Sequence, residues 1–372
     1  MGLVGAPFRS DPGLCPPRAS SFVTVNTLPS QDLSPWRACV APMLDWTDRH
    51  CRYFHRLLSP HARLYTEMLT TGALVHGNML RFLEYNQEEH AVALQLGGSE
   101  PADLAHCAKL AQQFGYDEVN LNCGCPSERV QRGAFGACLM NEATLVADCV
   151  KAMIDAVGGD PKVPITVKHR IGIDQIESYD YVRDFVGTVA NAGCEVFIVH
   201  ARNAWLKGLS PKENREIPPL RYEVVHQLKR DFPHLTIVLN GGLADNPSCV
   251  AQLQRGVMIA GVALDGVMVG RAAYHNPWLM ADWDELLFGL PPREQALTRE
   301  AVEAEMVAYT EREMARTAGW AHGEVRWPQV IRHILGLYHG LPGARRWRQV
   351  WSDHKLKDLS PTDVMAIAHQ RP

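Results

Sequence analysis

A turn-forming segment in the first half of the chain carries the residue types needed for proton transfer. The stretch 120–127 reads Asn-Leu-Asn-Cys-Gly-Cys-Pro-Ser, in which an apolar run ends and Gly124 with Pro126 predicts a sharp turn. Cys125 lies in that turn, where a substrate could reach its thiol. Because a free thiol is mostly protonated at neutral pH, it could act as a general acid as well as a nucleophile. A structural buried thiol is the alternative, and it is our interpretation of Cys123.

Polar residues also end several other short, β-prone runs of the sequence. In a purely structural core each of them would cost several kcal/mol if it were buried without a partner. They are therefore candidates to contact a bound group, and they comprise Gln95, Lys168, His200 and Asn240. A surface lysine and a satisfied core histidine are the alternatives for Lys168 and His200.

Eight β-prone runs position these residues, and helical stretches separate them. The runs are 38–43, 63–68, 91–97, 118–122, 165–170, 195–200, 236–240 and 266–270. Strands that alternate with helices predict a parallel sheet, and eight such units over about 235 residues fit a (β/α)₈ TIM barrel. A doubly wound open sheet is the alternative, but it normally has a Gly-x-Gly-x-x-Gly turn after its first strand. This chain has Ala41-Pro42-Met43-Leu44 there.

Helix-forming signals mark the segments between the runs and after them. Helices are predicted to begin at Ser99 with Pro101, at Ser178 and at Asn246-Pro247. Residues 295–372 show only helical periodicity, in the segments 301–317, 328–337, 344–352 and 361–369. We therefore expect a barrel domain at 36–290 and an all-helical domain at 295–372. Residues 1–35, with six prolines, predict a disordered extension, and an organelle-targeting peptide is the weaker alternative.

Glycines follow the seventh and eighth predicted strands. Gly241-Gly242 and Gly270-Arg271 would place two adjacent loops rich in backbone N–H groups at the barrel mouth, which is the usual phosphate site of this fold. Glycines that only form turns are the alternative explanation. A barrel with a phosphate site, a lysine, a histidine and a cysteine acid indicates an FMN enzyme, in which the protein supplies position and a proton.

Composition excludes several classes of protein. The 372 residues are 46% hydrophobic and 21% charged, which is ordinary for a globular chain. No run of 18 apolar residues or secretory signal occurs, so we expect no membrane association. The ten cysteines are scattered and form no Cys-x-x-Cys pair, which favours reduced thiols in a cytoplasm and no metal site.

Net charge separates the C-terminal segment from the rest of the chain. The formal charge of −4 by itself argues against a nucleic-acid partner. Residues 326–372, however, hold eight basic and three acidic residues, and the segment 343–348 places three arginines around Trp347. This pattern favours contact with RNA phosphates supported by an aromatic ring, with a solvated charged helix face as the alternative.

The chain resembles the tRNA-dihydrouridine synthases, and specifically their A subfamily, over about residues 38–352. The motifs that carry the resemblance are 41–53, 64–68, 121–127, 133–140, 200–202, 206–215 and 265–277. It implies an FMN-containing barrel that uses NADPH to reduce the C5–C6 double bond of uridines 20 and 20a in the tRNA D-loop. In that chemistry the reduced flavin gives hydride to C6 and Cys125 protonates C5. We expect a cytoplasmic monomer.

The resemblance also assigns roles to individual positions. The flavin would be held by Pro42, Met43, Leu44, Gln95, Lys168, His200, Asn240, Gly241, Gly242, Gly270 and Arg271. Asn122 would place the uracil. The tRNA would be contacted by Lys212, Arg215, Arg345 and Arg348. Two departures are Cys123, where the family often has an aliphatic residue, and 254–264, which looks longer than usual.

Other functions fit parts of this pattern. A small-molecule FMN reductase of the dihydroorotate dehydrogenase type would share the flavin barrel. An aldolase would use Lys168 as a Schiff base and need no flavin. An RNA-binding module would need the arginines but not Cys125.

Overall fold

The computed structural model of the protein describes residues 34–77, 79–254, 261–320 and 323–370. The disordered extension expected at 1–35 lies outside these residues except for its last two positions. Most of the long stretch 254–264 also lies outside them. Among the described helices, none is both long and apolar enough to cross a membrane.

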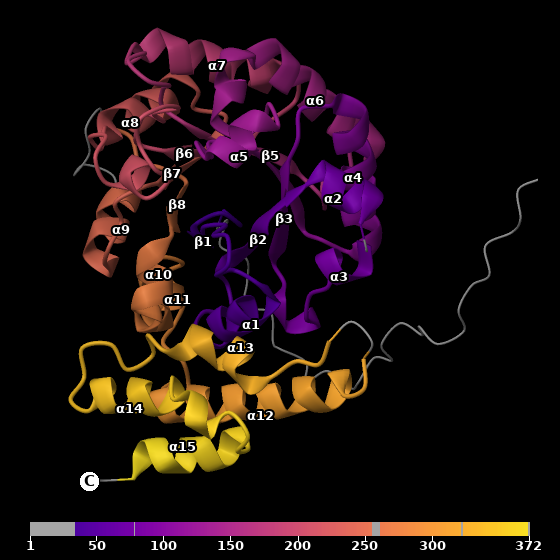
Figure 1. The fold of residues 1–372 in the computed structure, drawn as a ribbon. Helices are drawn as coiled ribbons and strands as arrows, with labels where there is room; N and C mark the ends of the chain where they lie inside the picture. The colour runs from indigo at the N-terminus through magenta and orange to yellow at the C-terminus, as the bar shows by residue number, and fades with distance from the viewer. Residues whose placement is uncertain (1–33, 78, 255–260, 321–322, 371–372) are drawn as a thin grey trace, which may run out of the picture. The chain divides into compact units, whose positions relative to one another are not determined.

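Eight parallel strands form a closed barrel, which confirms the (β/α)₈ prediction (Figure 1). Each strand pairs with its neighbour in sequence, and β1 pairs with β8 through the register Cys39–Met268. This pairing closes the ring and rules out the open, doubly wound sheet. The strands are β1 (Ala38–Val40), β2 (Arg63–Thr70), β3 (Val92–Gly97), β4 (Glu118–Cys123), β5 (Ile165–Arg170), β6 (Val196–His200), β7 (Thr236–Asn240) and β8 (Gly266–Val269).

The helices of the barrel region lie mostly outside the ring of strands in Figure 1. They are α1 (Arg49–Leu58), α2 (Thr71–His76), α3 (Met79–Leu83), α4 (Pro101–Phe114), α5 (Glu128–Arg132), α6 (Ala143–Ala156), α7 (Tyr179–Asn191), α8 (Tyr222–Asp231), α9 (Asn246–Leu253), α10 (Arg271–His275) and α11 (Trp283–Leu286). The three predicted helix starts are confirmed at α4, α7 and α9. In α4, Pro101 occupies the first turn and Gly115 ends the helix with φ of 83°, a left-handed conformation that glycine adopts readily.

A buried carboxylate organises the barrel interior at the amino-terminal end of the strands. Glu118, at the start of β4, is fully buried and accepts hydrogen bonds from the Tyr65 hydroxyl (2.8 Å) and the Arg63 guanidinium (3.0 Å). The indole N–H of Trp36 donates to it as well, at 2.8 Å. These donors offset the desolvation of the charge, so the polar group can remain inside an otherwise apolar core.

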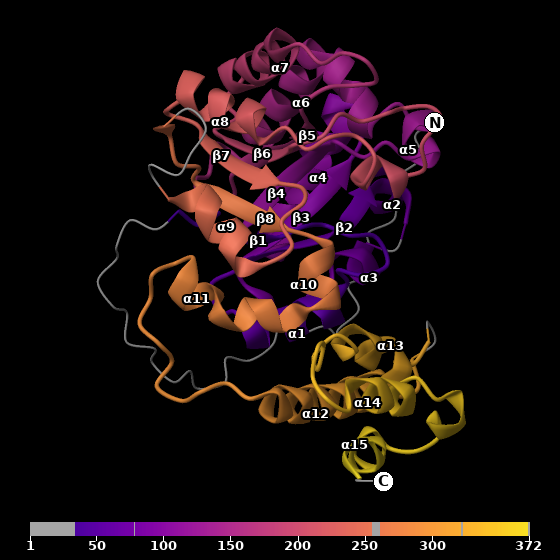
Figure 2. The same ribbon diagram turned by 90° about the vertical axis from the view of Figure 1, so that its left-hand side faces the viewer.

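Four helices follow the barrel and pack on one another in both ribbon views (Figure 1, Figure 2). They are α12 (Arg299–Thr317), α13 (Trp327–Ile331), α14 (Ala344–Trp351) and α15 (Pro361–His369). The predicted helical periodicity of this region is confirmed, although the segment 328–337 is α-helical only as far as Ile331 and continues as a short 3₁₀ turn.

The interior of this helical region corrects our interpretation of Trp347. Its indole is buried and donates to the carboxylate of Glu303 at 2.8 Å, and Trp351 donates to the same oxygen at 2.9 Å. Trp347 therefore stabilises the helical packing and does not support RNA from the surface. Its neighbours Arg345 and Arg348 point outward because the helix turns by about 100° per residue, which places the two charged side chains on the opposite face.

Candidate active site

Asn122 holds the turn that presents Cys125 at the carboxyl end of β4. Its side-chain oxygen accepts the backbone N–H groups of Gly124 (3.1 Å) and Cys125 (3.0 Å), which is the local bonding that asparagine favours in turns. The backbone oxygen of Cys125 accepts a hydrogen bond from the N–H of Ala137 at 2.9 Å. Cys125 is partly exposed, whereas Cys123 is fully buried, so only Cys125 can meet a substrate.

The same asparagine connects the turn to a hydrogen-bonded chain inside the barrel. Asn122 donates to Gln95 (3.0 Å), and Gln95 donates to Asn120 (2.7 Å). Asn120 then donates to the Thr166 hydroxyl (2.7 Å), which bonds the buried Glu118. The two backbone N–H groups of the turn can only donate, so they fix the oxygen of Asn122 toward the turn and its nitrogen toward Gln95. The orientations of the Gln95 and Asn120 amides then follow in the same way. Gln95, which was predicted to contact the flavin, is thus connected to the Cys125 turn by its hydrogen bond with Asn122.

Lys168 and Asn240 meet at the ends of β5 and β7. The Lys168 ammonium donates to the side-chain oxygen of Asn240 at 2.9 Å, and Asn240 donates to the Met268 carbonyl at 2.8 Å. Burial, followed by the nearby charge of Arg170, lowers the pKa of Lys168 to about 7, while Cys125 acts in the opposite direction. A lysine in this state gains charge when an anion binds beside it.

Positive charge accumulates around His200. Burial, followed by the charges of Arg170, Lys168 and Arg202, holds the pKa of His200 well below its usual range, so the ring is neutral at pH 7. Arg170 itself is buried and donates to the backbone oxygens of Asn203 (3.1 Å) and Gly124 (3.2 Å). No carboxylate among the described residues pairs with Arg170, so its charge is available to an anion in the mouth.

The loop after β7 has a backbone conformation that requires glycine. Gly241 and Gly242 have φ of 109° and 70°, which residues with a side chain rarely adopt. A Cβ at Gly241 would lie 2.5 Å from the His200 ring, so only glycine fits against it. Arg271 differs from expectation in its partner, since its guanidinium pairs with Glu216 at 2.6 Å. An entering phosphate would have to compete with that carboxylate.

The segment after β1 is open to solvent on one side. Pro42 and Met43 are partly exposed and Leu44 is 68% exposed, while Met43 also packs against the barrel core. The Met43 N–H donates to the Thr47 hydroxyl at 2.9 Å, which holds this segment in a turn. Pro42, Met43 and Leu44 therefore offer an apolar strip that could lie against a planar ring.

Comparison with known proteins identifies the family of the chain. A model of the dihydrouridine synthases matches residues 39–369. The chain belongs to the dihydrouridine synthase family. It is 56% identical over 333 residues to the tRNA-dihydrouridine(20/20a) synthase of Vibrio cholerae, covering 89% of this chain and 95% of the relative. It is also 54% identical over 334 residues to the tRNA-dihydrouridine(20/20a) synthase of Escherichia coli strain K12, covering 90% of both chains.

Within this dihydrouridine synthase fold, the positions expected to face tRNA fall in two places. Lys212 and Arg215 are exposed in the long loop between β6 and α8, and the backbone oxygen of Arg215 accepts a hydrogen bond from Arg271 at the mouth. Arg345 and Arg348 are exposed on α14 in the helical region. The first pair thus adjoins the mouth, and the second belongs to the separate group of helices.

The structure adds two cations to the site residues expected from the sequence. Arg170 ends β5 and links two mouth loops, and Arg202 follows β6 and donates to the Pro218 carbonyl, with its Nε buried and without a partner among the described residues. Both stand at the end of an apolar strand run, which is the same sequence signal that pointed to Lys168 and His200. The strand-end pattern of the sequence already places Arg170 beside Lys168 and Arg202 beside His200, but neither arginine was assigned a role from the sequence.

Proposed function

We propose that the chain is an FMN-dependent enzyme that reduces uridines 20 and 20a of the tRNA D-loop to dihydrouridine, with NADPH as the electron source. The observation that carries this proposal is the placement of the Cys125 thiol, on a turn fixed by Asn122, at a barrel mouth lined with cations. The activity for which the two relatives are named supports the same conclusion.

The residues of the mouth fit a flavin phosphate and ring. When bound, FMN would supply the hydride chemistry that amino-acid side chains lack. Lys168, Arg170 and the glycine pair at 241–242 provide the positive charge and close backbone approach that an anion requires. Gln95 and Asn240 offer fixed amide groups, and the strip 42–44 offers an apolar surface. This fit would be hard to explain for a flavin-free aldolase.

Cys125 would protonate C5 of the uracil, and Asn122 would hold the turn that positions the thiol. Ser127, whose hydroxyl lies 3.5 Å from the Cys125 sulfur, could restore the proton from solvent. A base that is stacked inside tRNA cannot reach this turn, so the target uridine must be extruded. The extrusion costs a few kcal/mol, which the cationic mouth and the exposed arginines would offset.

We propose a division of labour between the two regions of the chain. Residues 36–290 would carry the flavin and the chemistry, and residues 295–372 would bind tRNA through Arg345 and Arg348. The nine described cysteines are free, in keeping with our proposal that the enzyme works as a monomer in a reducing cytoplasm.

A reconstitution experiment tests the proposal. The purified protein should show a flavin spectrum and convert unmodified tRNA transcripts to tRNA with dihydrouridine at positions 20 and 20a, faster with NADPH than with NADH. Transcripts with cytidine at both positions are the matched control and should gain no dihydrouridine. Reduction of orotate or free uracil at comparable rates, with tRNA left unchanged, would favour the small-molecule reductase instead.

A further inference from the structure

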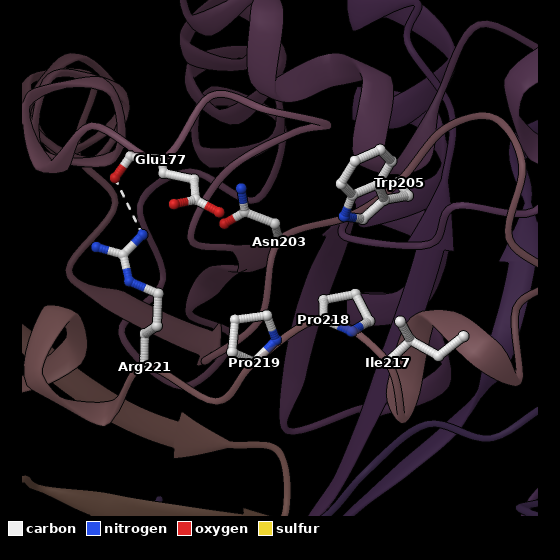
Figure 3. Close-up of a pocket in the computed structure, with 7 residues that line it drawn as sticks. All are labelled: Glu177, Asn203, Trp205, Ile217, Pro218, Pro219 and Arg221. Atoms are coloured by element: carbon white, nitrogen blue, oxygen red, sulfur yellow. Dashed lines mark hydrogen bonds between the residues drawn. The ribbon is translucent and has the colours of Figure 1, made fainter.

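A pocket opens beside the mouth, between the loop that leads into α7 and the loop that follows β6 (Figure 3). Its volume is about 150 Å³, the size of an engineered cavity that holds a benzene ring. We call it the rim pocket. It is lined by Glu177, Asn203, Trp205, Pro218, Pro219 and Arg221, with Ile217 at its edge.

The amide of Asn203 has an acceptor that is left without a donor. Its nitrogen donates to the backbone oxygens of Asp174 (3.2 Å) and Ile176 (3.0 Å), and these two carbonyls fix the orientation of the amide. Its oxygen has no hydrogen-bond partner among the described residues, although the residue is only 5% exposed. A buried acceptor in this state is costly, and a ligand that brings a donor removes the cost.

The carboxylate of Glu177 is a second acceptor among the lining side chains. Figure 3 shows the carboxylate of Glu177 directed toward the amide of Asn203. Glu177 is exposed, and its backbone oxygen, which accepts from Arg221 at 3.0 Å, anchors the residue while the side chain remains free to rotate. Two acceptors that line one pocket can both be satisfied by one group with two N–H donors, which is what an amino group on a ring provides.

Most of the remaining wall is apolar, and the Arg221 guanidinium is already bonded to the Glu177 carbonyl and to Glu223. Trp205 and the rings of Pro218 and Pro219 form the apolar part, and an indole is a good stacking surface for a nucleobase. The combination selects a planar ring that carries an exocyclic amino group, namely cytosine, adenine or guanine. Uracil would place a carbonyl oxygen against Asn203 and Glu177, so the pocket would reject the base that the mouth accepts.

Direct hydrogen bonds join the rim pocket to the Cys125 turn. Arg170 bonds the backbone oxygens of both Gly124 and Asn203. Gln131, on α5, donates to the Pro126 carbonyl at 2.7 Å and to the Leu206 carbonyl at 2.8 Å. A nucleotide held in the pocket would therefore be positioned relative to the catalytic thiol through two short links.

We propose that the rim pocket binds a second unstacked tRNA base, one that bears an amino group and is close in the chain to the target uridine. The inference rests on the proposed function, because it takes tRNA as the substrate. Exposed lysines in the same loop, Lys207 and Lys212, favour a polyanion over a free base as the occupant. Binding of this second base would set the register in which the uridine enters the mouth.

The test compares two carboxylates at opposite ends of the barrel. Glu177→Ala removes the pocket acceptor, and the matched control Glu195→Ala removes an exposed carboxylate just before β6, at the other end of that strand. Loss of a negative charge alone should tighten the binding of a polyanion, as expected for Glu195→Ala. Glu177→Ala should instead weaken tRNA binding severalfold, and Trp205→Ala should weaken it about tenfold because the stacking surface is removed. Binding is measured on the oxidised holoenzyme by filter retention, independently of turnover.

Base analogues identify the occupant. Transcripts in which single D-loop guanosines are replaced by inosine lack the 2-amino group, and others replace single adenosines or cytidines by uridine. At one position, the base replacement should weaken binding to the wild-type protein. The same replacement should not further weaken binding to the Glu177→Ala variant. Equal binding of Glu177→Ala and Glu195→Ala would overturn the proposal, as would a change confined to the KM for NADPH. Failure of the wild type to reduce tRNA at all would refute the proposed function separately.

Discussion

The side-chain oxygen of Asn122 lies 3.0 Å from the backbone nitrogen of Cys125, and the amide nitrogen of the same residue lies 3.0 Å from the side-chain oxygen of Gln95. One amide group therefore ties the turn of the proposed acid to the polar interior of the barrel. The position of the thiol depends on the strand β4 and not only on the loop that follows it.

Replacing Asn122 by alanine should therefore loosen the turn and lower both stability and turnover. The substitution exposes two turn N–H groups and leaves the Gln95 oxygen without a donor, which should cost about 1–3 kcal/mol in the free energy of unfolding. Urea denaturation and tRNA reduction measure the two effects. Asn122→Asp is the control, since it retains the two accepted bonds and loses only the donor to Gln95, so its turnover should lie between those of the wild type and Asn122→Ala. Equal turnover of all three proteins would show that the turn does not need this amide.

Cys125→Ala should retain the flavin spectrum and lose about 10²–10⁴-fold in the rate of tRNA reduction, the usual contribution of a general acid. The rate is measured in a single turnover of the prereduced enzyme. Cys123→Ala is the matched control two residues away. Burial holds the pKa of Cys123 well above its usual range, so its thiol takes no part in proton transfer, and the variant should react at nearly the wild-type rate. A similar rate loss in both variants would indicate damage to the loop and not the absence of an acid.

FMN affinity should fall as the pH rises above 7. The pKa of Lys168 is lowered to about 7, chiefly by burial, so the free protein loses this charge above that pH, and binding of the anionic cofactor beside it requires a proton to be taken up. The dissociation constant of FMN should rise by up to about tenfold per pH unit between pH 7 and the higher pKa that Lys168 has in the complex with FMN. Fluorescence quenching of FMN measures it, and the interval lies above the phosphate pKa of about 6.

Lys168→Met is the control for this pH dependence. It should bind FMN more weakly at pH 7 and with an affinity that no longer changes up to pH 9. A wild-type affinity that is constant across this interval would show that Lys168 does not hold the anion.

Removing Arg345 and Arg348 together should weaken tRNA binding and reduce its salt dependence. For each phosphate that the protein no longer neutralises, the slope of log K against log salt should become shallower by roughly 0.7–0.9. Binding at several salt concentrations measures the slope. Arg346→Ala is the control on the same helix, because that guanidinium bonds the backbone oxygen of Gln370 within the protein. An unchanged slope in the double variant would place the tRNA phosphates elsewhere.

The arrangement of strands and helices was predictable because it depends on local patterns. The apolar runs became β1 to β8, and Pro101 and Ser178 mark helix starts as expected. It was also predictable that the polar residues at the strand ends lie close together, because the C-terminal ends of all parallel strands lie at the same face of a barrel. Lys168 and Asn240, 72 positions apart, meet for this reason.

Contacts between distant segments were decided only by the tertiary structure. Nothing near Arg271 in the sequence shows that Glu216 pairs with it, and the arginines around Trp347 suggested a surface ring that in fact bonds the buried Glu303. The rim pocket likewise needs Glu177 and Asn203, which come from two different loops, to line one cavity. The residues that end each strand could be predicted from the order of residues alone, because hydrophobic periodicity is a local property. Which of those residues meet, and which keep an unpaired atom, depends on how the loops pack, and that is a property of the folded chain alone.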